Sequence, residues 1–97
     1  MTRAEALAKL RTHRDDLRAM GIQHVAIFGS TARDEATPTS DLDLAVTLRP
    51  DMHLGWDYFD LDERIGKLLG VSVDLVSDPD RRPRLRAAIE RDRVDAF

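Results

Sequence analysis

At 97 residues, the chain is long enough for one domain, residues 1–97, and too short for a second packed core. Its composition is 42% hydrophobic and 34% charged with only 5% aromatic, which is typical of a globular protein with an aliphatic core, and its net charge is −3. The absence of cysteine excludes disulfides, thiolate metal sites and a cysteine nucleophile. No apolar stretch approaches the ~20 residues of a membrane span, and the acid among the first five residues argues against a signal peptide. We therefore expect a soluble, cytoplasmic protein that does not enter a membrane.

The charge is distributed unevenly along the chain. Residues 28–80 hold twelve acidic and four basic groups, whereas residues 1–27 hold five basic and three acidic groups, and residues 81–97 hold six basic and three acidic groups. Solvated surfaces account for most such patterns on small domains. An acidic middle segment nevertheless repels phosphate, so nucleotide binding by this chain would require bridging metal ions.

The first predicted element is a helix over residues 3–20. Thr2 and Glu5 have the spacing of a capping box, in which each side chain accepts a hydrogen bond from the other residue's backbone amide. Gly21 is a natural end for this helix. The apolar residues lie mostly on one helical stripe: Ala6, Leu7, Leu10, Leu17 and Met20.

Three short segments predict strands. Residues 23–28 and 71–76 are apolar without a helical period, and residues 41–48 begin with strict alternation of acidic and apolar side chains. The segments between and after them predict a turn and short helix at 29–33, a loop around Pro38, a helix over 56–69 that ends at Gly70, and a last helix from Pro83. The order α-β-α-β-α-β-α predicts an α/β (α+β) fold, a small mixed sheet flanked by helices.

Gly29 and Ser30 come directly after the first predicted strand. A glycine there lets the backbone approach a ligand closely, and the serine adds a hydroxyl beside the free amides of a helix N-terminus, which favour phosphate. Gly-Ser pairs are common in turns, so this pair alone does not establish a phosphate site.

Three aspartates on strand positions are stronger evidence. Asp41 and Asp43 project from the same face of one strand, while Leu42 and Leu44 anchor the other face. Two adjacent carboxylates repel unless a cation lies between them, and hard oxygen ligands suit Mg²⁺. Asp74 adds an acid to an otherwise apolar strand, where a covered carboxylate needs a partner. Solvent-facing positions are the alternative for all three, but their coincidence on strands favours a two-metal site.

These residues resemble the nucleotidyltransferase superfamily that includes DNA polymerase β. Gly29-Ser30, ten residues and Asp41-x-Asp43 reproduce its signature G-S-x10-D-x-D. The stretch GSTARDEATPTSDLDLAV is similar to the minimal nucleotidyltransferases, which usually read G-S-x-A-R-G-x5-S-D-[IL]-D-L. The resemblance covers most of the chain, including a later V-D-L-V strand with Asp74. Asp34 departs from it, because the family commonly has glycine there, and this affects the loop and not the metal ligands.

The resemblance implies a polymerase β-like nucleotidyltransferase fold and an enzyme that transfers AMP from ATP and releases pyrophosphate. Asp41 and Asp43 would each contact two Mg²⁺ ions, and Asp74 would complete the site of the catalytic ion. Gly29 and Ser30 would hold oxygens of the β- and γ-phosphates. One ion would activate the acceptor hydroxyl and the other would hold the triphosphate.

The acceptor has to be presented by another molecule, since 97 residues leave no room for the acceptor-binding domains of polymerases and antibiotic nucleotidyltransferases. The resemblance implies a partner HEPN-domain toxin, modified on a hydroxyl, with tyrosine favoured, and makes this chain the antitoxin of the pair. Two alternatives stay open: a non-catalytic module that neutralises its partner by occlusion, and the catalytic subunit of a small-molecule nucleotidyltransferase. The sequence does not decide the nucleotide preference or whether the chain forms homo-oligomers.

Arginines offer further candidate contacts. Arg33 has the forked donor geometry that suits a phosphate, and we predict it as a nucleotide-binding residue, with surface pairing to Asp34 or Glu35 as the equal alternative. A second group of arginines, near the C-terminus, has no aromatic residues between its members and lies in an acidic protein. Both features argue against direct nucleic-acid binding and favour a solvated face or a contact with a partner protein. That group consists of Arg81, Arg82, Arg84 and Arg86.

Histidines and aromatic residues give weaker signals. The three histidines lack metal-ligand spacing: His13, His24 and His53. The one aromatic cluster consists of Trp56, Tyr58 and Phe59. Core packing, a wall that stacks on a nucleotide base and a protein interface all stay open as its role.

Overall fold

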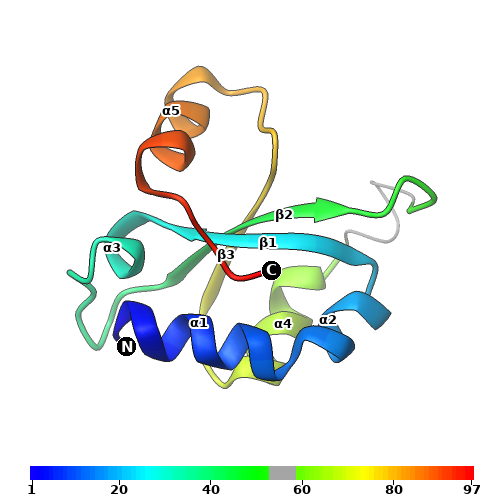
Figure 1. Ribbon diagram of the computed structural model, residues 1–97, viewed down its shortest axis with the longest axis horizontal. Helices are drawn as coiled ribbons and strands as arrows, with labels where there is room; N and C mark the ends of the chain where they lie inside the picture. Colours follow the sequence, from blue (N-terminus) through cyan, green and yellow to red (C-terminus); the bar gives the residue numbers. More distant parts are fainter. Residues whose placement is uncertain (53–58) are drawn as a thin grey trace.

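The computed structural model describes residues 1–52 and 59–97, and Figure 1 shows a sheet with helices on both sides. The strands are β1 (Ile22–Phe28), β2 (Leu42–Leu48), β3 (Val73–Ser77) and β4 (Val94–Asp95). The helices are α1 (Arg3–Thr12), α2 (Arg14–Ala19), α3 (Gly29–Ala32), α4 (Leu61–Leu69) and α5 (Pro83–Asp92). This arrangement confirms the predicted α/β class with a small mixed sheet.

The sheet has the strand order β3-β2-β1-β4. β1 runs antiparallel to both β2 and β4, whereas β2 and β3 are parallel. In this register Asp43 lies opposite Phe28 on one neighbouring strand and opposite Asp74 on the other. The segment that follows Phe28 therefore begins beside the predicted acidic residues.

The two faces of the sheet differ in how they are covered (Figure 1). Helices α1, α2 and α4 pack on one face and form the main core, which includes the fully buried Leu10, Leu17, Leu44 and Ile65. On the other face, Ile89 of α5 packs in a small cluster with Phe28, Ala45 and Val76. Burying one such aliphatic side chain contributes about 1.5–3 kcal/mol, so the main core supplies most of the apolar stabilisation. The lightly covered face can carry polar side chains.

The first helix begins as predicted but does not continue as predicted. The Thr2 hydroxyl accepts from the Glu5 amide at 3.1 Å and the Glu5 carboxylate accepts from the Thr2 amide at 3.4 Å, which confirms the capping box. The single helix predicted over 3–20 is wrong, because His13 leaves helical geometry and separates α1 from α2. Residues 11–16 contain no apolar side chain that could hold a straight helix against the core.

Two further elements differ from the prediction. The two-residue strand β4 was not predicted, since two residues are too few to show an alternating pattern. Helix α4 begins at Leu61 after Asp60 in a left-handed conformation, φ 55°, and not at residue 56; residues 56–58 lie outside the described part of the chain. Among the described helices, the longest have ten residues, and none is long and apolar enough to cross a membrane.

Asp34 occupies the position where the resemblance led us to expect glycine, and its φ is +62°. This left-handed conformation costs a non-glycine residue about 1–2 kcal/mol. The Asp34 carboxylate accepts a hydrogen bond from the backbone amide of Arg3 at 2.9 Å, in the first turn of α1. An anion at a helix N-terminus is favourable, so the aspartate offsets its backbone strain by attaching the loop to α1.

Candidate active site

Gly29 and Ser30 form the start of α3, at the end of β1. Gly29 has φ +71°, and a Cβ at this position would overlap the carboxylate of Asp43. Glycine is therefore favoured here for two reasons, its positive φ and the close approach of the Asp43 carboxylate to the loop. The geometry joins two parts of the sequence motif that lie fourteen residues apart.

The sheet aligns two of the three predicted aspartates, while Asp41, which the sequence placed on the strand 41–48, lies just outside it. Asp43 and Asp74 are register partners on neighbouring parallel strands, which lie about 4.8 Å apart, and Asp41 comes directly before β2. Asp43 is half-buried, whereas Asp41 and Asp74 are exposed. The solvent-facing alternative therefore describes Asp41 and Asp74, although Asp74, on an edge strand, is aligned with Asp43.

The environment of Asp43 disfavours its charge. Burial raises the pKa of the Asp43 carboxyl above its usual value, and the negative charges of Asp74 and Asp41 raise it further, while Arg33 acts in the opposite direction. Each of these groups is near enough to Asp43 to affect its ionisation. The site consequently has a negative potential that Arg33 offsets only in part and that a cation would relieve.

This raised pKa predicts a pH-dependent stability difference between the wild type and Asp43→Asn. The folded protein holds the Asp43 proton more tightly than the unfolded chain does, so the carboxyl destabilises the fold increasingly as the pH rises from its usual pKa of 3.8 through the raised folded value. We expect the free energy of unfolding of Asp43→Asn to equal or exceed that of the wild type at neutral pH, and the gap to close below pH 3.8. Urea denaturation over this pH range, without divalent cations, measures the gap. A large loss of stability in Asp43→Asn at neutral pH would contradict the prediction and indicate a structural acceptor.

The donor chemistry at this edge suits Mg²⁺, since carboxylate oxygens from two adjacent strands share one face. In the described residues 1–52 and 59–97, however, no three His, Asp or Glu side chains are grouped closely enough to hold a metal ion. Mutual repulsion opposes such a grouping unless a cation is present. The residue types and their shared face therefore suit the ion, while the metal site itself stays a prediction.

Arg33 is held by two carboxylates. Its Nη1 donates to Asp92 Oδ2 at 2.6 Å and its Nε donates to Glu35 Oε2 at 3.2 Å, and these hydrogen bonds raise the pKa of the guanidinium. The predicted pairing with Glu35 is present, but Asp34 instead binds the Arg3 amide. Asp92, whose side chain is only 5% exposed, was missed because it lies 59 residues away at the end of α5. A phosphate would compete with both carboxylates for Arg33, whose role as a nucleotide ligand stays a prediction.

The remaining predicted residues lie away from this group or outside the described chain. Arg82 binds Asp80, and its hydrogen bonds lower the pKa of Asp80 to about 2, while the other three arginines of that cluster are exposed. His13 contacts Asp16, and Phe59 is 75% exposed. His53, Trp56 and Tyr58 fall within the residues that the structure does not describe.

Comparison with protein families and curated proteins gives consistent matches. A family model described as a nucleotidyltransferase domain matches residues 10–96. The chain is 36% identical over 89 residues to a candidate protein adenylyltransferase of Methanocaldococcus jannaschii, with 88% of each chain covered. It is 35% identical over 77 residues to the protein adenylyltransferase MntA of Thermococcus cleftensis, which covers 78% of this chain and 77% of that one.

Solved structures share the fold. A candidate minimal nucleotidyltransferase superposes with a TM-score of 0.75 and 35% identity over 97% of this chain and 95% of that one. A toxin–antitoxin complex with AMP-PNP gives a TM-score of 0.69 at 21% identity, over 100% of this chain and 73% of that one. A complex of a tri-AMPylated Shewanella oneidensis HEPN toxin with its MNT antitoxin gives 0.60 at 17% identity, over 89% and 70% of the two chains.

Proposed function

Because this chain belongs to the nucleotidyltransferase domain family as a minimal nucleotidyltransferase, we propose that it transfers AMP from ATP to a hydroxyl of a HEPN-type toxin and acts as the antitoxin. The observation that carries the proposal is the parallel register of Asp43 with Asp74, beside Gly29, where a Cβ would overlap the Asp43 carboxylate. Relatives of similar length are named protein adenylyltransferases. The fold is also shared with antitoxins in complexes with their toxins. We place the protein in the cytoplasm, where its proposed substrate ATP is available.

The residues divide the work of the reaction. Gly29 lets the loop approach the triphosphate, and the Ser30 hydroxyl donates to a phosphate oxygen. Asp41, Asp43 and Asp74 would hold two Mg²⁺ ions, which when bound neutralise the charge on the transferred phosphoryl group and the leaving pyrophosphate. The acceptor oxygen, for which we favour that of a tyrosine, forms a bond to the α-phosphorus. At the same time the bond between the α-phosphorus and the oxygen that joins it to the β-phosphate breaks, and pyrophosphate leaves. Asp74, exposed on the edge strand, accepts the proton of the hydroxyl.

We expect nucleotide binding to depend on a divalent cation. The acidic edge repels the triphosphate, so ATP in EDTA should bind at least about tenfold more weakly than MgATP, a difference of about 1.4 kcal/mol. Titration calorimetry with the full chain, in Mg²⁺ and in EDTA, measures both affinities. Equal affinity in the two conditions would contradict a metal-bridged site.

Transfer itself is tested with α-labelled ATP and a purified HEPN-type protein. We expect the label on the HEPN-type protein, on tyrosine, and unlabelled pyrophosphate in solution. Each of the four nucleoside triphosphates is tested in turn, which decides the nucleotide preference. No label from any of them would exclude the proposed acceptor.

A further inference from the structure

Strand β3 forms one edge of the sheet. In the described part of the chain it pairs with β2 and with no other strand. The Leu42 amide donates to the Ser72 carbonyl at 2.9 Å, and Leu42 is the register partner of Val73. Because backbone groups alternate in direction along a strand, Asp74 bonds toward β2, and the amides and carbonyls of Val73 and Leu75 point to the free edge. These groups are a template for one further strand.

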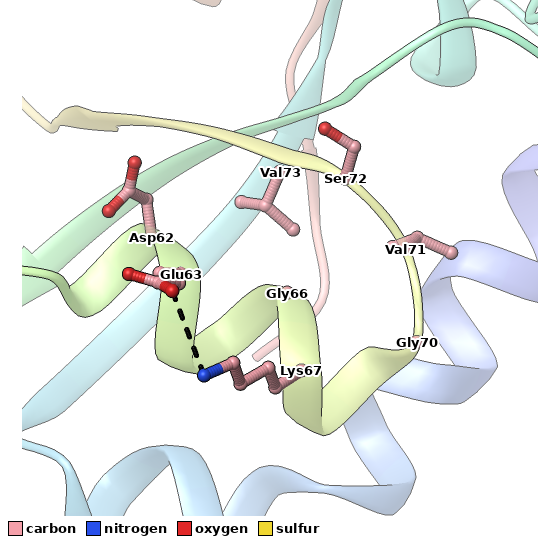
Figure 2. Close-up of a pocket in the computed structure, with 8 residues that line it drawn as sticks. All are labelled: Asp62, Glu63, Gly66, Lys67, Gly70, Val71, Ser72 and Val73. Atoms are coloured by element: carbon pink, nitrogen blue, oxygen red, sulfur yellow. Dashed lines mark ion pairs between the residues drawn. The ribbon is translucent and has the colours of Figure 1, made fainter.

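A groove lies along the start of this edge, between β3 and α4 (Figure 2). Its volume is about 520 Å³, and it is lined by Asp62, Glu63, Gly66, Lys67, Gly70, Val71, Ser72 and Val73. Gly66 brings the helix close to the chain, since a Cβ there would lie 2.9 Å from the Val71 carbonyl oxygen. Lys67 pairs with Glu63 at 3.6 Å, which leaves Asp62 as the excess charge. The groove is thus open, partly apolar and net acidic.

We propose that the free edge of β3 is the docking site of the acceptor protein, which adds an extended segment as a fifth strand and presents its hydroxyl residue opposite Asp74. The inference rests on the proposed function and specifies how the acceptor reaches the site. Side chains that lie opposite each other on adjacent strands point to the same face, so the partner residue opposite Asp74 shares the face of the aspartates. The added strand would lie about 4.8 Å from β3, on the side of Asp74 away from Asp43. The two neighbours of that partner residue in the segment face the α4 groove.

The charge of the groove favours one kind of segment at the free edge of β3. The excess acid of the groove complements basic side chains at positions of the segment that face α4. A second copy of this chain fits poorly, because pairing centred on the same register would place two Asp74 carboxylates directly opposite each other. We therefore infer an extended partner segment with a central hydroxyl residue and flanking lysines or arginines.

A peptide tests the docking without the whole partner. The probe is acetyl-Lys-Val-Thr-Tyr-Thr-Val-Lys-amide, in which the tyrosine faces the aspartates while the threonines and lysines face the groove. We expect it to slow hydrogen exchange of the Val73 and Leu75 amides about tenfold in NMR spectra of the full chain, and to bind about fivefold more tightly than the version with glutamates for lysines. Absence of protection at millimolar peptide, or protection of the Asp95 amide on the opposite sheet edge instead, would overturn the proposal. Protection that depends on protein concentration without peptide would assign the edge to a second copy and overturn it as well.

Matched variants test the same edge with the protein acceptor. Val73→Pro removes one outward amide and leaves the bonds to β2 in place, whereas Val73→Thr keeps both the amide and the branched shape. We expect Val73→Pro to lower AMP transfer at least about tenfold relative to Val73→Thr, with unchanged MgATP affinity.

If Val73→Pro lowers the melting temperature, Asp62→Lys replaces it as the test variant, with Asp15→Lys on α2 as its control. Only Asp62→Lys should then slow AMP transfer. Equal transfer by variant and control would refute docking while AMP transfer stands. Peptide protection without AMP transfer by the wild type would refute the proposed function while docking stands.

Discussion

Replacing both Asp41 and Asp43 by alanine is expected to reduce AMP transfer to the partner at least about a thousandfold and to abolish protection against the toxin in cells. In the proposed mechanism these two carboxylates would help to hold the Mg²⁺ ions, so their loss would leave the developing phosphoryl charge without compensation. The fold should persist, because the neighbouring Leu42 and Leu44 are buried on the opposite face of β2. Label transfer from α-labelled ATP, and growth of cells that carry the toxin, measure the two effects.

The control is a second double variant that removes the same number of carboxylates elsewhere. Asp15 and Asp16 are exposed on α2, on the far side of the main core, so Asp15→Ala with Asp16→Ala should transfer AMP at the wild-type rate. If the Asp41 and Asp43 variant transfers nothing but still protects cells, neutralisation works by occlusion. Loss of protection together with loss of transfer supports the enzyme as the antitoxin.

The predictable parts of this structure are those that local sequence controls. Alternation in residues 41–48 predicted that Leu42 and Leu44 would be buried while Asp43 faces the other side, and the structure confirms this. The capping box at Thr2 was visible for the same reason, since its two partners lie three residues apart. Such patterns need only the 2.0 and 3.6 residue periods of strands and helices.

The parts that could not be predicted depend on distant partners. The sequence places Asp43 and Asp74 on strands, but their alignment depends on a parallel register that no local pattern encodes. Asp92 reaches Arg33 only because α5 leads into β4, which pairs with β1 next to Gly29. The shape of the loop at Asp34 likewise depends on the start of α1, 31 residues earlier in the chain.

Gly29→Ala is expected to destabilise the protein by about 2–4 kcal/mol and to abolish MgATP binding. The new methyl group would overlap the Asp43 carboxylate, and the residue would keep a φ of +71° that alanine disfavours. Gly70→Ala is the matched control, because Gly70 has nearly the same φ, +73°, while a Cβ there has no neighbour within 4 Å. Backbone strain alone should cost Gly70→Ala about 1 kcal/mol. Urea denaturation of both variants gives the difference, which measures the overlap with Asp43.

A double-mutant cycle attributes that difference to Asp43. With Asp43→Ala present, the overlapped oxygen and carboxyl carbon are gone and the remaining Cβ lies at an ordinary contact distance of 3.5 Å. Gly29→Ala should then cost no more than Gly70→Ala, so the cycle should show a coupling of about 1–3 kcal/mol between Gly29 and Asp43. Additive costs would mean that the Asp43 side chain moves aside freely when the methyl group is present. In that case the loop and the carboxylate would not be held together, and the geometry of the site would have to be set by the bound nucleotide and metal.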